Sequence, residues 1–185
     1  MKKLIPLGAV VLSVISPVQA KEVAGVDVAE TLVISGTSLH LNGAGVRSKF
    51  FMDLYVGSLY LQNKQTQLTQ VLQQPQAVVR LNITSGMITS EKMTDAITEG
   101  FELATDDNAV SIEQQVNAFM AFFVQEIKKG DQFTFVTSTT MGVMTFKNGQ
   151  ELGVIKGESF RQALLKIWLG DEPAQKSLRK AMLDQ

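Results

Sequence analysis

The spacing of hydrophobic positions along this chain changes between two patterns, one typical of strands and the other typical of amphipathic helices. Runs rich in β-branched and aromatic residues predict strands up to residue 83, including a hairpin over Leu32–Leu41 and a long strand over Phe50–Leu61. Apolar residues then recur every three or four positions in two predicted amphipathic helices, one starting at Thr89 and the other running from Ser111 to Ile127. Three further strands and two further helices are predicted at 132–137, 141–146, 151–156, 158–169 and 173–183. This order indicates an α+β fold, in which helices cover one face of a large, mostly antiparallel sheet.

The first twenty residues have the three parts of a cleavable secretory signal peptide. Two lysines precede an apolar stretch at residues 4–15, and small residues end the segment at Ala20. The apolar stretch is too short for a membrane span, so we expect cleavage after Ala20 and no stable span afterwards. The expected mature chain, 21–185, is a single domain that is periplasmic or secreted.

Composition narrows the possible function classes. The chain has no cysteine, which excludes a lipoprotein anchor, disulfides and a cysteine nucleophile. Without the signal peptide, 15 Lys+Arg face 18 Asp+Glu and no basic run occurs, which argues against a nucleic-acid partner. The single histidine, His40, cannot build a usual zinc site, and alternation along the predicted strand turns it toward solvent. The acidic run at 106–108 lacks the spacing of a calcium loop, so the sequence indicates neither a metal nor a cofactor.

The most informative segment is residues 41–61. Gly43 and Gly45 permit a bend or the close approach of another backbone, and Arg47 then enters an apolar region rich in aromatic residues. A guanidinium in such surroundings is an anion receptor, because it offers a planar fork and stays charged under partial burial. From the pattern alone, the favoured alternative is a guanidinium that reaches solvent or pairs with an acid such as Asp53.

This segment, Gly-Ala-Gly-Val-Arg followed by Lys-Phe-Phe, resembles the chalcone isomerase family, particularly its bacterial exported branch. The resemblance continues at Thr89-Ser90-Glu91-Lys92-Met93, at Phe146-Lys147-Asn148-Gly149 and from Phe160 to Gly170, and it covers roughly residues 25–183. It implies an open-faced β-sandwich, in which a layer of helices covers a large antiparallel sheet and a ligand lies in the cleft between them.

The resemblance also implies roles for individual residues. In the plant enzymes, an arginine in the glycine-rich segment stabilises phenolate and enolate charge while a hydroxychalcone closes to a flavanone, assisted by a threonine and a tyrosine. Arg47 occupies the arginine position, but the threonine falls on Tyr55, the catalytic tyrosine on Thr89 and a substrate-binding asparagine on Ala96. Some relatives bind fatty acids instead, with the arginine and a tyrosine on the carboxylate. Arg47 and Tyr55 suit that role, with Phe51 in the apolar wall.

We therefore expect an exported, non-catalytic protein that binds a fatty acid or another amphipathic anion. One alternative is an intramolecular lyase or isomerase acting on a chalcone-like phenolic or unsaturated ketone, with Arg47 as its catalytic residue. Another is a structural or interaction protein of the cell envelope. A cleft filled by side chains, with Arg47 paired to an internal acid, would favour that last alternative.

Overall fold

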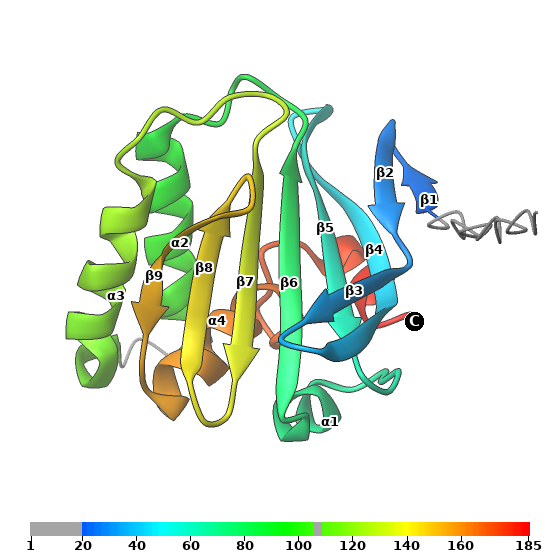
Figure 1. Cartoon of the computed structure of the whole chain (residues 1–185). Coiled ribbons are helices and arrows are strands. Elements are labelled where there is room, and N and C mark those ends of the chain that lie inside the picture. Colours follow the sequence, from blue (N-terminus) through cyan, green and yellow to red (C-terminus); the bar gives the residue numbers. More distant parts are fainter. Residues whose placement is uncertain (1–19, 106–108) are drawn as a thin grey trace, which may run out of the picture.

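The structure is a computed structural model that describes residues 20–105 and 109–185 of the 185-residue chain (Figure 1). The expected signal peptide, apart from Ala20, and the acidic run at 106–108 lie outside the described residues. Within these two ranges, none of the helices has the length and apolar character that crossing a membrane requires.

A seven-stranded antiparallel sheet forms the centre of the fold. Its strands lie in chain order, so each inner strand pairs with the one that precedes it and the one that follows it. They are β3 (Thr31–Ile34), β4 (Thr37–Lys49), β5 (Met52–Leu61), β6 (Gln76–Ile83), β7 (Gln132–Ser138), β8 (Gly142–Lys147) and β9 (Gln150–Ile155). A separate hairpin of β1 (Ala20–Val23) and β2 (Val26–Ala29) precedes the sheet.

Helices cover one face of this sheet (Figure 1). They are α1 (Leu68–Gln73), α2 (Ser90–Ala104), α3 (Glu113–Met120), α4 (Glu158–Leu169) and α5 (Lys176–Met182), with 3-10 turns at Ala109–Ile112 and Ala121–Phe123. Alternation along the strands separates two cores: Val79 packs on the helix side, whereas Val78 packs on the other face with residues of the β1–β2 hairpin such as Val28. The expected α+β fold, with a helical layer over a large antiparallel sheet, is confirmed.

Three predicted elements have different bounds in the structure. The strand expected from Phe50 begins at Met52, because β4 continues to Lys49 and pairs there with Met52, which leaves Phe50 and Phe51 as the turn. The helix expected over 111–127 is regular only over α3, although Phe123 and Ile127 beyond it are buried. An apolar stripe therefore predicts which residues are buried more directly than it predicts their backbone conformation.

The last helix also starts later than its sequence suggests. The helix is predicted from residue 173, yet α5 begins at Lys176. The backbone N–H of Ala174 donates to the carbonyl of Ile167 at 2.8 Å, so the chain folds back onto α4 before the new helix begins. Pro173 and Ala174 thereby become part of a cavity wall.

Candidate functional site

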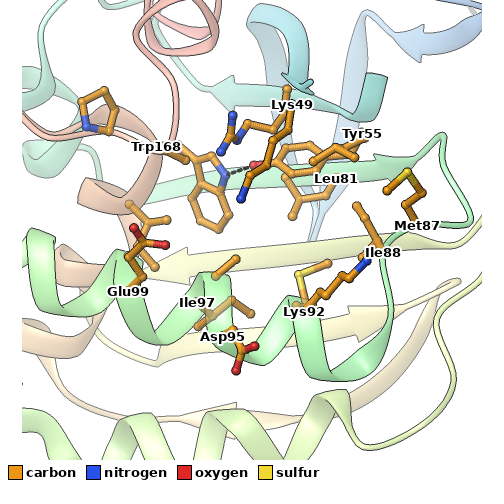
Figure 2. Close-up of a pocket in the computed structure, with 18 of the residues that line it drawn as sticks. Lys49, Tyr55, Leu81, Met87, Ile88, Lys92, Asp95, Ile97, Glu99 and Trp168 are labelled. Carbon is orange, nitrogen blue, oxygen red and sulfur yellow. Dashed lines mark hydrogen bonds between the residues drawn. The ribbon is translucent and has the colours of Figure 1, made fainter. Parts of the chain in front are cut away.

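A cavity of about 520 Å³ lies between the sheet and the helices α2 and α4. Its volume is within the range of small-molecule sites, and its inner wall is largely apolar. Figure 2 shows Tyr55 and Trp168 on one side of it and the α2 residue Ile97 on the other. Arg47 at the end of β4 also lines the cavity.

Strand pairing places Arg47 beside Tyr55. The two residues are direct partners in the β4–β5 register, so their side chains leave the same face of the sheet as neighbours. That face is the helix side, because Tyr55 belongs to the core beneath the helices. One polar pair therefore enters a mostly apolar cavity from two adjacent strands.

The two glycines of β4 let α5 approach the sheet closely. A Cβ atom added to Gly43 would lie 2.0 Å from the carbonyl oxygen of Ala181, and one added to Gly45 would lie 2.6 Å from the Ala181 Cβ. This confirms the close backbone approach expected from the sequence. It also brings Gln175, which precedes α5, against the end of β4, where its Oε1 accepts a hydrogen bond from the backbone N–H of Ser48 at 3.0 Å.

Protein hydrogen bonds hold the Arg47 guanidinium through one of its three nitrogens. Its Nη1 donates to Gln175 Oε1 and to the Ser48 carbonyl, both at 2.9 Å. No carboxylate forms an ion pair with it within residues 20–105 and 109–185, and Asp53 instead accepts a hydrogen bond from the Ser48 hydroxyl at 2.8 Å. The Nε and Nη2 groups have no protein acceptor in the described part of the chain. Together they form the fork that binds a carboxylate through two hydrogen bonds.

Tyr55 supplies a neutral phenol next to this fork. Its hydroxyl oxygen accepts a hydrogen bond from Trp168 Nε1 at 3.1 Å, shown dashed in Figure 2. Burial raises the pKa of the phenol above its ordinary value of 10.0, against the opposing effects of the Trp168 hydrogen bond and the Arg47 charge. Tyr55 is therefore protonated at neutral pH. Because its oxygen already accepts from Trp168, its own O–H can donate to an anion held by Arg47.

Charged side chains other than Arg47 occupy the exposed part of the cavity lining. Lys49 and Lys92 lie there together with three acids, and all five side chains are exposed. The acids are Asp95, Glu99 and Glu172. The site thus combines an apolar interior, one anion-binding group inside and a mixed-charge rim.

The structure brings together three of the five residues expected at the site. Arg47, Tyr55 and Ala96 line the cavity, whereas Thr89 and Phe51 do not. Thr89 caps α2, where its hydroxyl oxygen accepts a hydrogen bond from the backbone N–H of Lys92 at 3.2 Å. Phe51 is fully exposed in the β4–β5 turn, and its neighbour Phe50 lines the cavity instead.

Sequence reasoning missed the two residues that hydrogen-bond to the Arg47 and Tyr55 side chains from the helical layer, Trp168 and Gln175. Trp168 had a usable signal, because it is the only tryptophan of the chain and stands near the end of a predicted helix whose apolar face must meet the sheet. Gln175 had none, since nothing local to its sequence shows that α5 will pack on the glycines of β4.

Known proteins share this architecture. A fatty-acid binding protein of Arabidopsis thaliana superposes with a TM-score of 0.63 at 16% sequence identity, covering 84% of this chain and 96% of that protein. A search of curated proteins finds no match. The family model described as chalcone isomerase-like matches residues 20–184, nearly the whole described chain. With the layered fold and the cleft between sheet and helices, this match shows that the chain belongs to the chalcone isomerase-like family.

Proposed function

We propose that the cavity binds a fatty acid or another amphipathic anion without catalysing a reaction. The observation that carries the proposal is the Nε–Nη2 edge of Arg47, which faces no protein acceptor in the described residues and stands beside the neutral phenol of Tyr55. The fork and the phenol supply three hydrogen bonds to a carboxylate, while the apolar wall suits a hydrocarbon chain. The fold shared with a fatty-acid binding protein of Arabidopsis thaliana is consistent with this function.

The surroundings of Arg47 favour binding over catalysis. The only histidine, His40, is exposed on β4 and does not line the cavity. The hydroxyl of Thr89, at the position of the family's catalytic tyrosine, already caps α2. The three acids of the lining are exposed, so their carboxylates lie at the rim and not in the interior beside Arg47.

Binding of palmitate to delipidated protein, measured by isothermal titration calorimetry, tests this function. Arg47→Ala removes the two charge-assisted hydrogen bonds of the fork, and we expect the affinity to fall about 100-fold or more. Arg80→Ala is the matched control, because Arg80 lies on the opposite face of the sheet, where its Nε donates to Thr134 Oγ1 at 3.1 Å. That variant should bind palmitate as the wild type does.

Three results would contradict the proposal. Wild-type protein, purified without detergent, would show no bound lipid by native mass spectrometry and no affinity for palmitate. Alternatively, Arg47→Ala and Arg80→Ala would bind palmitate equally well. Turnover of a hydroxychalcone above the spontaneous rate, lost in Arg47→Ala, would replace the binding function with an isomerase activity.

We further propose that the protein is exported and acts in the periplasm or outside the cell. The basis is the signal-peptide pattern of the first twenty residues. Intact-mass measurement of protein recovered from the periplasmic fraction should give a chain that starts at Lys21. Recovery of an uncleaved chain from the cytoplasm would contradict export.

A further inference from the structure

The turn between β4 and β5 differs from the other two-residue turns between strands in the described residues. Four two-residue turns join strands in the described part of the chain, and both central residues of each have positive φ. Three of them place glycine second: Ala24-Gly25, Ser35-Gly36 and Asn148-Gly149. The fourth has Phe50 at φ +50° and Phe51 at φ +64°. Bulky residues are strained in this region, so the turn carries two aromatic rings against the backbone preference.

These rings do not stabilise the folded protein by packing. Phe50 is 77% exposed and Phe51 is fully exposed, and neither belongs to a buried core. Met52 and Met87, at 39% and 43%, are also exposed. We call these four residues the apolar tip. Phe50, Met52 and Met87 also line the cavity, so the apolar tip is continuous with the cavity mouth. Strain and exposure at one place indicate that something outside the chain covers it.

The charges beside the apolar tip indicate what covers it. Lys49 and Lys92 are exposed residues of the same cavity lining, and Lys49 Nζ lies 5.7 Å from the centre of the Phe50 ring. The exposed acid next to Met52, Asp53, accepts a hydrogen bond from the Ser48 hydroxyl. The lining also holds three exposed acids, of which Glu99 lies across the cavity from Met87 (Figure 2). Aromatic rings next to lysines suit the boundary of a bilayer, where rings enter the acyl region and ammonium groups meet lipid phosphates. A narrow two-residue turn projects outward, and a fluid lipid surface can enclose such a shape without a matching groove.

We propose that the apolar tip inserts into the interface of a phospholipid bilayer and holds the cavity mouth against the membrane. This extends the proposed function by naming the membrane as the place where an amphipathic ligand is collected or released. The membrane contact itself depends on the apolar tip and not on Arg47, so the two proposals can fail independently.

Flotation of the mature protein with vesicles of phosphatidylcholine and phosphatidylglycerol tests the contact. We expect the wild type to float with the vesicles and Phe50→Asn/Phe51→Gly to lose at least about tenfold in partitioning, because both rings are removed. This variant places the preferred Asn-Gly pair in the turn, so it should melt at a higher temperature than the wild type, and a folding defect cannot account for its loss. Val33→Ser, which removes a 67% exposed apolar side chain from β3, is the control and should float as the wild type does.

The outcomes separate the contact from the cavity function. Arg47→Ala should still float. Phe51→Gly, which removes the one ring of the apolar tip that does not line the cavity, should still bind palmitate presented without vesicles. Failure of the wild type to float, or undiminished flotation of Phe50→Asn/Phe51→Gly, overturns the membrane contact. A wild-type dimer that dissociates on this double substitution, with no vesicle binding, would show that a second copy of the chain covers the apolar tip and would likewise overturn it.

Discussion

Replacing Tyr55 by phenylalanine separates the two roles that the structure gives to this hydroxyl. The phenol accepts a hydrogen bond from Trp168, which is 3% exposed, and it donates to the anion in the proposed complex. Without the oxygen, the buried indole N–H loses its acceptor, so we expect the free energy of unfolding to fall by about 1–3 kcal/mol. Loss of one hydrogen bond to a carboxylate is worth about 1.5–3 kcal/mol, so palmitate affinity should fall roughly 10–100-fold.

The chain contains a matched control for this substitution. Its other tyrosine, Tyr60, lies on the opposite face of β5, and its buried hydroxyl has no hydrogen-bond partner among the described residues. Tyr60→Phe should therefore leave the free energy of unfolding unchanged or raise it by up to about 1 kcal/mol, with palmitate affinity unaffected.

Urea unfolding followed by circular dichroism, together with calorimetric titration of palmitate, measures both effects. Equal stability losses for Tyr55→Phe and Tyr60→Phe would refute the assignment of the Trp168 hydrogen bond. A loss of stability in Tyr55→Phe with unchanged palmitate affinity would refute the contact between the phenol and the ligand, and would leave Tyr55 as a purely structural residue.

Two further substitutions test the framework around the site. Gly43→Ala should lower the free energy of unfolding, measured in urea, by about 3 kcal/mol or more. The added Cβ would lie 2.0 Å from the Ala181 carbonyl oxygen, so α5 would have to move. A loss below about 1 kcal/mol would contradict that contact. At Asp131, partial burial alone would raise the carboxyl pKa, but hydrogen bonds from Asn148, from a backbone N–H and from Lys147 hold it below its ordinary value of 3.8. The resulting stabilisation, about 1–2 kcal/mol, is therefore present at neutral pH and lost as the pH falls through and below 3.8. Urea midpoints of the wild type and Asp131→Asn should accordingly converge in acid, and a difference that stays constant down to the lowest pH would contradict this role.

Much of the fold was predictable because its signals are local. Strand and helix periods predicted the order of elements apart from the short helix α1, and the hairpin predicted over Leu32–Leu41 is present with its turn at Ser35-Gly36. The β4–β5 turn escaped prediction for the same reason, because Phe50 and Phe51 have none of the residue preferences of a tight turn. Their aromatic character instead indicated a strand.

The candidate site was predictable only in part, because it is assembled by contacts distant in sequence. Arg47 stood out as a charge within an apolar segment, whereas Tyr55 was identified through the resemblance to the family and not from its strand pairing with Arg47. Trp168 meets Tyr55 across 113 residues, and Gln175 meets Arg47 across 128. Such pairings depend on how α4 and α5 pack on the sheet, and no local pattern encodes that packing.

The indole of Trp168 gives this protein an intrinsic optical probe. Because the chain has a single tryptophan and that residue lines the cavity, its fluorescence comes from one place and is free of contributions from other indoles. Its ring stacks on Phe135 at a centroid distance of 5.7 Å, and its N–H is bonded to Tyr55, so its emission reports on polarity and hydrogen bonding in the cavity wall. Occupancy of the cavity can thus be followed in unlabelled protein, in real time and at nanomolar to micromolar concentration.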